Sequence, residues 1–100
     1  MHKDIIWSPL ADDDLYHVIE YLLSNWNPRV ANNFLDILYE HLEIIANNPK
    51  QFPLVYKTRK YRKCVVTKHN TVYYKEQEEN ILLLRIFDTR QNPKKLKLKF

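Results

Sequence analysis

Cationic side chains in the second half of the chain are the residues best suited to chemistry. Guanidinium groups bind phosphate through two parallel hydrogen bonds, stay charged at any cellular pH and can stabilise the extra negative charge of a phosphoryl-transfer transition state. These residues therefore predict a surface that binds an anionic partner, either nucleic acid or an acidic polypeptide. The candidate cations are Lys57, Arg59, Lys60, Arg62, Lys63, Arg85, Arg90, Lys94 and Lys95.

Four tyrosines lie among these cations, and they allow two interpretations. Aromatic rings between cations can stack on bases, which contributes about 1–3 kcal/mol per base. Tyrosine is also common in β-strands, so these four residues could be present for structural reasons alone. Both interpretations stay open for Tyr56, Tyr61, Tyr73 and Tyr74.

Other kinds of catalytic or metal site have little support in the sequence. The four histidines, His2, His17, His41 and His69, show no metal-ligand spacing. The chain contains no glycine for a phosphate-binding loop, and no serine or cysteine lies in a nucleophile context. The single cysteine, Cys64, excludes an internal disulfide and is expected to be a buried, inert thiol. We therefore expect no metal, no cofactor and no hydrolase or kinase chemistry.

The charge is divided between the two halves of the chain. The formal net charge is +4, but residues 1–56 contain three basic and eight acidic residues, whereas residues 57–100 contain thirteen basic and four acidic ones. The halves therefore carry −5 and +9. This division predicts an acidic helical side and a basic sheet side, with the bland alternative of an ordinary solvated surface.

Strands that would carry these cations are predicted in the second half. Residues 81–87 form an apolar run that only Arg85 interrupts, which is typical of a central strand. Residues 61–67 and 71–75 are predicted as two further strands joined by a turn, in which Asn70 is the residue suited to positive φ. Short strands are expected over residues 3–7 and, at an edge, over residues 52–56.

Two helices are predicted between the first and second strands. Ser8 and Pro9 begin the first helix, and its inner stripe is expected to contain Ala11, Leu15, Val18, Ile19, Leu22 and Trp26. The three consecutive carboxylates, residues 12–14, are expected to be solvated and to favour the helix dipole. The second helix is predicted over residues 29–47, and the short connection makes the pair an antiparallel hairpin.

The order of elements predicts the α+β class, with the helical hairpin packed on one face of a twisted antiparallel sheet of four or five strands. Residues 1–100 have the size of one domain, and residues 94–100 could form a flexible basic tail, pair as a strand or wrap a partner. The chain opens without the apolar run of a signal peptide, and no stretch is long enough to span a bilayer. We expect a soluble, cytoplasmic protein.

Several short motifs together resemble the RelE/ParE superfamily, the toxins of bacterial type II toxin–antitoxin modules. They are Ile6-Trp-Ser-Pro-Leu-Ala11 with Asp14-Leu, then Pro49-Lys-Gln-Phe-Pro53, Tyr61-Arg62 and Asp88-Thr-Arg-Gln-Asn-Pro93. The similarity covers residues 3 to about 96. It implies a small growth-inhibiting toxin, known from plasmid stabilisation, that a cognate antitoxin neutralises; the oligomeric state stays open.

The superfamily has two mechanisms, and the resemblance is uneven between them. ParE-like members inhibit DNA gyrase by binding, and the Trp-Ser-Pro opening favours this mechanism. RelE-like members cleave mRNA on the ribosome, and in that case the resemblance makes Arg62 and Arg90 catalytic. After Arg90, however, this chain has no tyrosine or histidine to act as a general acid or base. We expect a ParE-like inhibitor, with a ribosome-dependent endonuclease and an inactive basic scaffold as alternatives.

Overall fold

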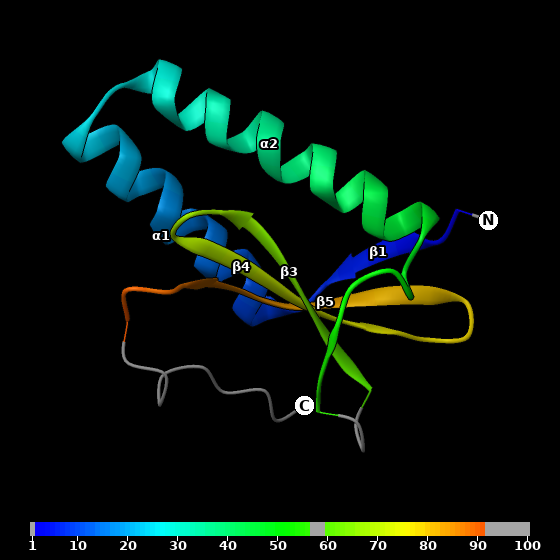
Figure 1. Ribbon diagram of the computed structural model, residues 1–100. Helices are drawn as coiled ribbons and strands as arrows, with labels where there is room; N and C mark the ends of the chain where they lie inside the picture. Colours follow the sequence, from blue (N-terminus) through cyan, green and yellow to red (C-terminus); the bar gives the residue numbers. More distant parts are fainter. Residues whose placement is uncertain (1, 57–59, 92–100) are drawn as a thin grey trace.

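The computed structural model describes residues 2–56 and 60–91, which form two helices and five strands (Figure 1). The antiparallel helical hairpin lies on one face of the sheet, as predicted. The α+β class is confirmed. The elements, in chain order, are β1 (Asp4–Trp7), α1 (Pro9–Asn25), α2 (Pro28–Asn47), β2 (Leu54–Tyr56), β3 (Tyr61–Thr67), β4 (Asn70–Glu76) and β5 (Asn80–Asp88).

The sheet has the order β1-β5-β4-β3-β2. β5 lies between β1 and β4, so its apolar run is an interior strand, although β4 occupies the middle of the sheet. The sheet is mixed rather than wholly antiparallel, because β1 runs parallel to β5 with Ile5 opposite Ile81. A parallel neighbour requires a long crossover connection, and the helical hairpin begins that connection.

The first helix begins as predicted, and the second begins at Pro28, one residue before the predicted start. The Ser8 Oγ accepts a hydrogen bond from the Ala11 amide at 3.1 Å, and the Asn27 Oδ1 accepts one from the Val30 amide at 3.0 Å. A proline follows each cap at the first helical position, where no hydrogen-bond donor is lost. Neither helix in the described part of the chain is long and apolar enough to cross a membrane.

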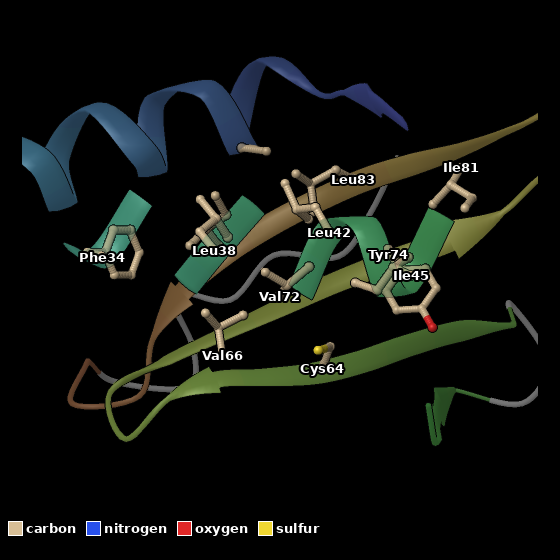
Figure 2. Close-up of a cluster of buried hydrophobic side chains, with 12 residues drawn as sticks. Phe34, Leu38, Leu42, Ile45, Cys64, Val66, Val72, Tyr74, Ile81 and Leu83 are labelled. Carbon is tan, nitrogen blue, oxygen red and sulfur yellow. The ribbon is translucent and has the colours of Figure 1, made fainter. Parts of the chain in front are cut away.

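The core lies between α2 and the sheet (Figure 2). Leu38, Leu42 and Ile45 of α2 face Val72 and other apolar side chains of the sheet, and all of them are buried. Cys64 belongs to this cluster, and burial raises the pKa of its thiol to about 11. The prediction of a buried cysteine is confirmed.

The turn between β3 and β4 differs from the prediction. Asn70 is buried and does not adopt positive φ; Lys60, with φ of 57°, is the residue that does so in the described part of the chain. The Asn70 Oδ1 accepts a hydrogen bond from the Thr67 hydroxyl at 2.9 Å. The strand pairing shifts between Val65 and Thr67, so an irregularity of the β-bulge type precedes the turn.

The start of α1 covers the edge of β5 beyond the end of β1. The Ser8 amide donates to Leu83 O at 2.9 Å, and the Ser8 hydroxyl donates to Leu84 O at 2.7 Å. One turn further on, the Asp14 Oδ2 accepts the amide of Ile86 at 2.9 Å. The prediction that residues 12–14 are all solvated is therefore wrong for Asp14, which replaces a missing strand partner.

Candidate functional surface

Arg62 is anchored by the loop between α2 and β2. It pairs in register with Tyr74, whose side chain is in the core, so Arg62 lies on the helix-covered face of the sheet. Its Nη1 donates to Phe52 O at 2.6 Å and to Lys50 O at 3.3 Å. These contacts fix the loop 50–52 against the sheet and use part of the donor capacity of the guanidinium group.

Arg90 lies just beyond β5, at the end of the sheet where β3 turns into β4. Its Nε and Nη2 donate to the two carboxylate oxygens of Asp88 at 3.0 and 2.8 Å, and its guanidinium carbon lies 5.5 Å from the ring centroid of Tyr21. The hydrogen bond from Arg90 lowers the pKa of Asp88, and the same bond raises the pKa of Arg90. Arg90 is half-exposed and remains a charged group at the surface.

Arg62 and Arg90 do not share a site. Arg62 is level with Tyr74 and, across the next strand, with Leu83, whereas Arg90 follows Asp88. Leu83 and Asp88 are five residue steps apart along β5, which is roughly 17 Å at the usual rise per residue. One substrate phosphate cannot contact both guanidinium groups in this arrangement.

Arg85 is held inside the protein rather than offered to a partner. It is 9% exposed, and its Nε and Nη2 donate to the Oδ2 and Oδ1 of Asp14 at 2.7 and 2.9 Å. The hydrogen bonds to Asp14 raise the pKa of Arg85. Arg85 therefore serves the packing of α1 on β5, and its predicted contact with a target conflicts with its burial.

The remaining predicted cations fall into two groups. Lys60 and Lys63 are exposed at the start of β3, as a contact surface requires. The other four, which are Lys57, Arg59, Lys94 and Lys95, lie outside the described residues.

Two of the four tyrosines are buried, which removes the stacking interpretation for them. Tyr74 has no exposed surface, its hydroxyl donates to Pro49 O at 2.6 Å, and burial raises its pKa. Tyr61 is 3% exposed and packs with Leu84 on the opposite face of the sheet. Both are strand residues that fill the interior, and the sequence pattern could not show this because alternation alone does not tell which faces are covered.

A groove of about 550 Å³ opens between the helical hairpin and the end of the sheet that carries Arg90. Its apolar wall includes Tyr21, Val30 and Ile37, together with Trp26, which is 65% exposed. Trp26 was predicted to lie on the buried stripe of α1, and that prediction is wrong. It follows the last residue of α1, and here the hairpin extends past the sheet and leaves it uncovered.

His69 is the member of the groove that sequence reasoning missed. It lies in the turn between β3 and β4, its carbonyl accepts the amide of Thr89 at 2.8 Å, and its side chain adds a small contribution to the lowered pKa of Asp88. His69 and Arg90 therefore line the same groove although they are far apart in sequence. The predicted pairing of residues 61–67 with residues 71–75 would have placed the turn that contains His69 beside the end of the last strand. That placement was the signal in the sequence that could have brought His69 and Arg90 together.

Comparisons with known proteins agree on one family. Residues 5–93 match the family model described as the ParE toxin of the type II toxin–antitoxin system parDE. No curated protein matches the sequence. Among solved structures, a chromosomal ParDE toxin–antitoxin system from P. aeruginosa has a TM-score of 0.74 at 15% identity, covering 87% of this chain and 96% of that one.

Two further structures have the same fold. The YoeB dimer from Staphylococcus aureus has a TM-score of 0.62 at 15% identity, covering 87% of this chain and 97% of that one. The DinJ–YafQ toxin–antitoxin complex from E. coli has a TM-score of 0.60 at 15% identity, covering 90% and 96%. At these identities the likeness concerns the fold alone.

Proposed function

Because this chain belongs to the ParE toxin family of type II toxin–antitoxin systems, we propose that it inhibits growth by binding an essential target, DNA gyrase, and that a cognate antitoxin neutralises it. Such a toxin acts in the cytoplasm, where gyrase and DNA are found. The protein needs no catalytic centre for this function, only a surface that holds the target.

The separation of Arg62 from Arg90 is the observation that favours inhibition by binding over mRNA cleavage. Cleavage of a phosphodiester requires preorganised positive charge around one phosphate. Here Arg62 is bound to the loop 50–52, whereas Arg90 is paired with Asp88, which lies roughly 17 Å further along the sheet than the Leu83 position level with Arg62. This arrangement supports inhibition by binding rather than an endonuclease built on these two arginines.

The exposed cations Lys60 and Lys63 are the described part of the proposed target-binding surface. They follow Lys57 and Arg59 in the sequence, and Lys94 and Lys95 complete the proposed set. Arg85 is omitted because its guanidinium is buried against Asp14.

A gyrase assay with a matched pair of charge reversals tests the proposal. Purified protein should inhibit the supercoiling of relaxed plasmid DNA by gyrase. Lys63→Glu should weaken this inhibition severalfold, whereas Arg29→Glu, the same charge change on the exposed start of α2, should leave it unchanged. Supercoiling that proceeds normally at saturating protein would contradict the proposal.

One observation favours the RelE-like endonuclease as a second candidate. His69 provides an imidazole in the groove beside Arg90, and imidazole is the commonest general acid or base. Toeprinting of a translated message with purified protein tests this alternative. Ribosome-dependent cuts that disappear in His69→Gln, with supercoiling unaffected, would establish the endonuclease in place of the gyrase inhibitor.

A further inference from the structure

The face of the sheet away from the helices has a covered centre (Figure 1). Tyr61 of β3 and Leu84 of β5 are 3% and 0% exposed there, and the partly buried Tyr73 and Leu82 pack against them. We call these four residues the second-face cluster. All four belong to strands, and neither helix contributes to the cluster. A leucine on a sheet face that only water contacts keeps part of its surface exposed, so another part of the chain must cover Leu84.

The covered area has a boundary within the same face. Val65 of β3 is 61% exposed, and Lys63 before it is exposed as well. Thr71 of β4 pairs with Val65, and Phe87 of β5 pairs with Thr71, yet these two residues are only 4% and 5% exposed. The cover therefore lies over β4 and β5 and reaches β3 only near Tyr61.

Of the chain outside the described residues, one segment has apolar side chains suited to this face. Residues 57–59 are Lys-Thr-Arg and contain none. Met1 precedes β1, where the Lys3 amide donates to Ala46 O of α2 on the helix side of the sheet. Residues 94–100 remain, and after the first lysine they alternate a lysine with a leucine or phenylalanine. Such alternation gives an extended chain one apolar side and one cationic side.

The length of this part of the chain fits the distance to the second-face cluster. Gln91 is the last described residue and follows the end of β5. Leu84 lies four residues back along β5 from Asp88, which is roughly 13 Å at the usual rise per residue. Residues 92–100 can span at most about 30 Å when extended. A chain that turns back after Gln91 can therefore pass over Leu84 and reach β3.

We propose that residues 94–100 dock in extended conformation on this face of the same molecule. Their apolar side covers the second-face cluster, and their cationic side faces solvent. The inward side chains are Leu96, Leu98 and Phe100, and the outward ones are Lys95, Lys97 and Lys99. The outward lysines then form a row that is held in place beside Lys63, rather than a free basic arm.

Apolar contact and covalent tethering favour docking, whereas charge opposes it. Lys63 and Lys75 lie on the same face, because each is in register with a member of the second-face cluster, and both repel a cationic segment. The segment is joined to the sheet through Gln91, and such a short connection gives it an effective concentration in the millimolar range. A separate molecule lacks this advantage. Added salt should screen the repulsion and strengthen docking.

Nuclear Overhauser effects (NOEs) in the isotopically labelled full-length chain test the proposal. The methyl groups of Leu98 should show NOEs to the ring protons of Tyr61 or Tyr73, and added salt should not weaken them. Backbone chemical shifts of residues 95–99 should depart from random-coil values. Random-coil shifts together with no NOE to the second-face cluster would overturn the inference.

Two double variants provide a matched comparison. Leu96→Ser with Leu98→Ser keeps every charge but should lower the midpoint temperature of unfolding by about 5 °C or more and shift the ring signals of Tyr61. Lys95→Ser with Lys97→Ser keeps the apolar side and should change the midpoint by less than about 2 °C. Equal midpoints for the two variants would overturn docking. If the leucine variant does not fold, Leu98→Ala, with the Leu96 NOEs as readout, replaces it.

A mixed sample of labelled and unlabelled chains tests whether the segment docks on its own molecule. NOEs between Leu98 and the second-face cluster should arise within one molecule. If they appear only between a labelled and an unlabelled chain, the occupant is a second copy of this protein and the inference is overturned.

One consequence of docking rests on the proposed function. In the supercoiling assay, Leu96→Ser with Leu98→Ser should inhibit gyrase severalfold less than the wild type although its charge is unchanged, because its lysines are no longer held in a row. Equal inhibition by this variant would overturn the role of docking in target binding. Supercoiling that proceeds normally with the wild type would contradict the proposed function instead, and the NOEs would still decide whether residues 94–100 dock.

Discussion

The three arginines of the sheet differ in what holds their guanidinium groups. Arg62 donates to backbone carbonyls of a loop, Arg85 to a carboxylate from α1, and Arg90 to the carboxylate two residues before it. Arg85 is the most deeply buried of the three, so its charge depends most on its partner. A charged group that is removed from water and then loses its partner is strongly destabilising.

Asp14→Ala should therefore lower the free energy of unfolding by about 3 kcal/mol, because it leaves Arg85 without its carboxylate and the Ile86 amide without an acceptor. Urea denaturation monitored by circular dichroism measures the loss. Asp13→Ala, one residue earlier on the exposed side of α1, is the control and should change stability by less than about 0.5 kcal/mol. Equal effects of the two variants would show that the pair with Arg85 adds no stability.

The buried thiol of Cys64 predicts that the folded protein loses stability as the pH becomes alkaline. Burial raises the pKa of its thiol to about 11 in the folded protein, above its ordinary value of 9.0. The protonated thiol contributes its full stabilisation at pH values below the pKa that Cys64 has in the unfolded chain. This stabilisation is lost as the pH rises through the higher pKa of Cys64 in the folded protein. The difference in stability between wild type and Cys64→Ala should thus shrink by on the order of 2 kcal/mol from pH 9 to pH 11. A difference that stays constant over this range would contradict the prediction.

Between β1 and α1, a single serine performs three tasks. The Ser8 amide donates to Leu83 O of β5, its hydroxyl donates to Leu84 O, and its Oγ accepts the free amide of Ala11 in α1. The strand, the helix and the neighbouring strand therefore depend on one residue, which is 4% exposed.

Ser8→Ala should cost about 2 kcal/mol of stability, because it removes the helix cap and leaves Leu84 O with one partner fewer. Ser24→Ala, at an exposed position near the end of α1, should be nearly neutral. Thermal unfolding of both variants makes the comparison. A drop in midpoint temperature no larger for Ser8→Ala than for Ser24→Ala would show that the cap is dispensable.

The elements could be predicted from sequence because their signals are local. Ser8 with Pro9 marks the start of α1, and the apolar run around Leu83 marks an interior strand. The parallel pairing of β1 with β5 could not be predicted. Ile5 and Ile81 are partners in this pairing, but they are far apart in sequence and no local pattern relates them. The arrangement Arg85–Asp14 was missed for the same reason.

For the candidate site, the sequence predicted contacts at Lys60 and Lys63, which are exposed, but it could not show which arginines are paired with a neighbouring carboxylate. It also predicted a buried Trp26, because a periodic stripe shows which face of a helix points inward and not how far the sheet extends beneath it. The groove exists where α1 and α2 extend past that end, and only the assembled fold reveals it.

In the described part of the molecule, carboxylates and cations are concentrated on different elements. Seven of the carboxylates belong to α1 and α2, where Arg29 is the one basic residue, whereas β3 and the turn after it contain cations without a carboxylate. The exposed apolar wall of the groove lies where the hairpin overhangs the end of the sheet. An apolar patch of this kind on a small protein marks an interaction site.

We expect the antitoxin to cover this wall, with Trp26 as an anchor. Trp26→Ala should weaken the complex by about 2 kcal/mol, or roughly thirtyfold in Kd, because large exposed aromatic residues dominate binding energy at interfaces. Titration calorimetry with the cognate antitoxin measures this. Since Trp26 is mostly exposed, the stability of the free toxin should change little. Tyr39→Ala, another exposed aromatic residue of the hairpin that does not line the groove, is the control and should bind normally.

The contacts that Ser8 and Asp14 make with β5 span between 71 and 76 residues of chain. Closing a loop of that length costs roughly 4 kcal/mol of chain entropy before any contact is gained. During synthesis, the first strand and the first turn of α1 must therefore wait for β5, which is translated last among the strands described. A chain that is released or cut before residue 80 lacks the partners of Ser8, Asp14 and Ile5 alike, so we expect incomplete translation products to be unfolded and harmless to the cell that makes them.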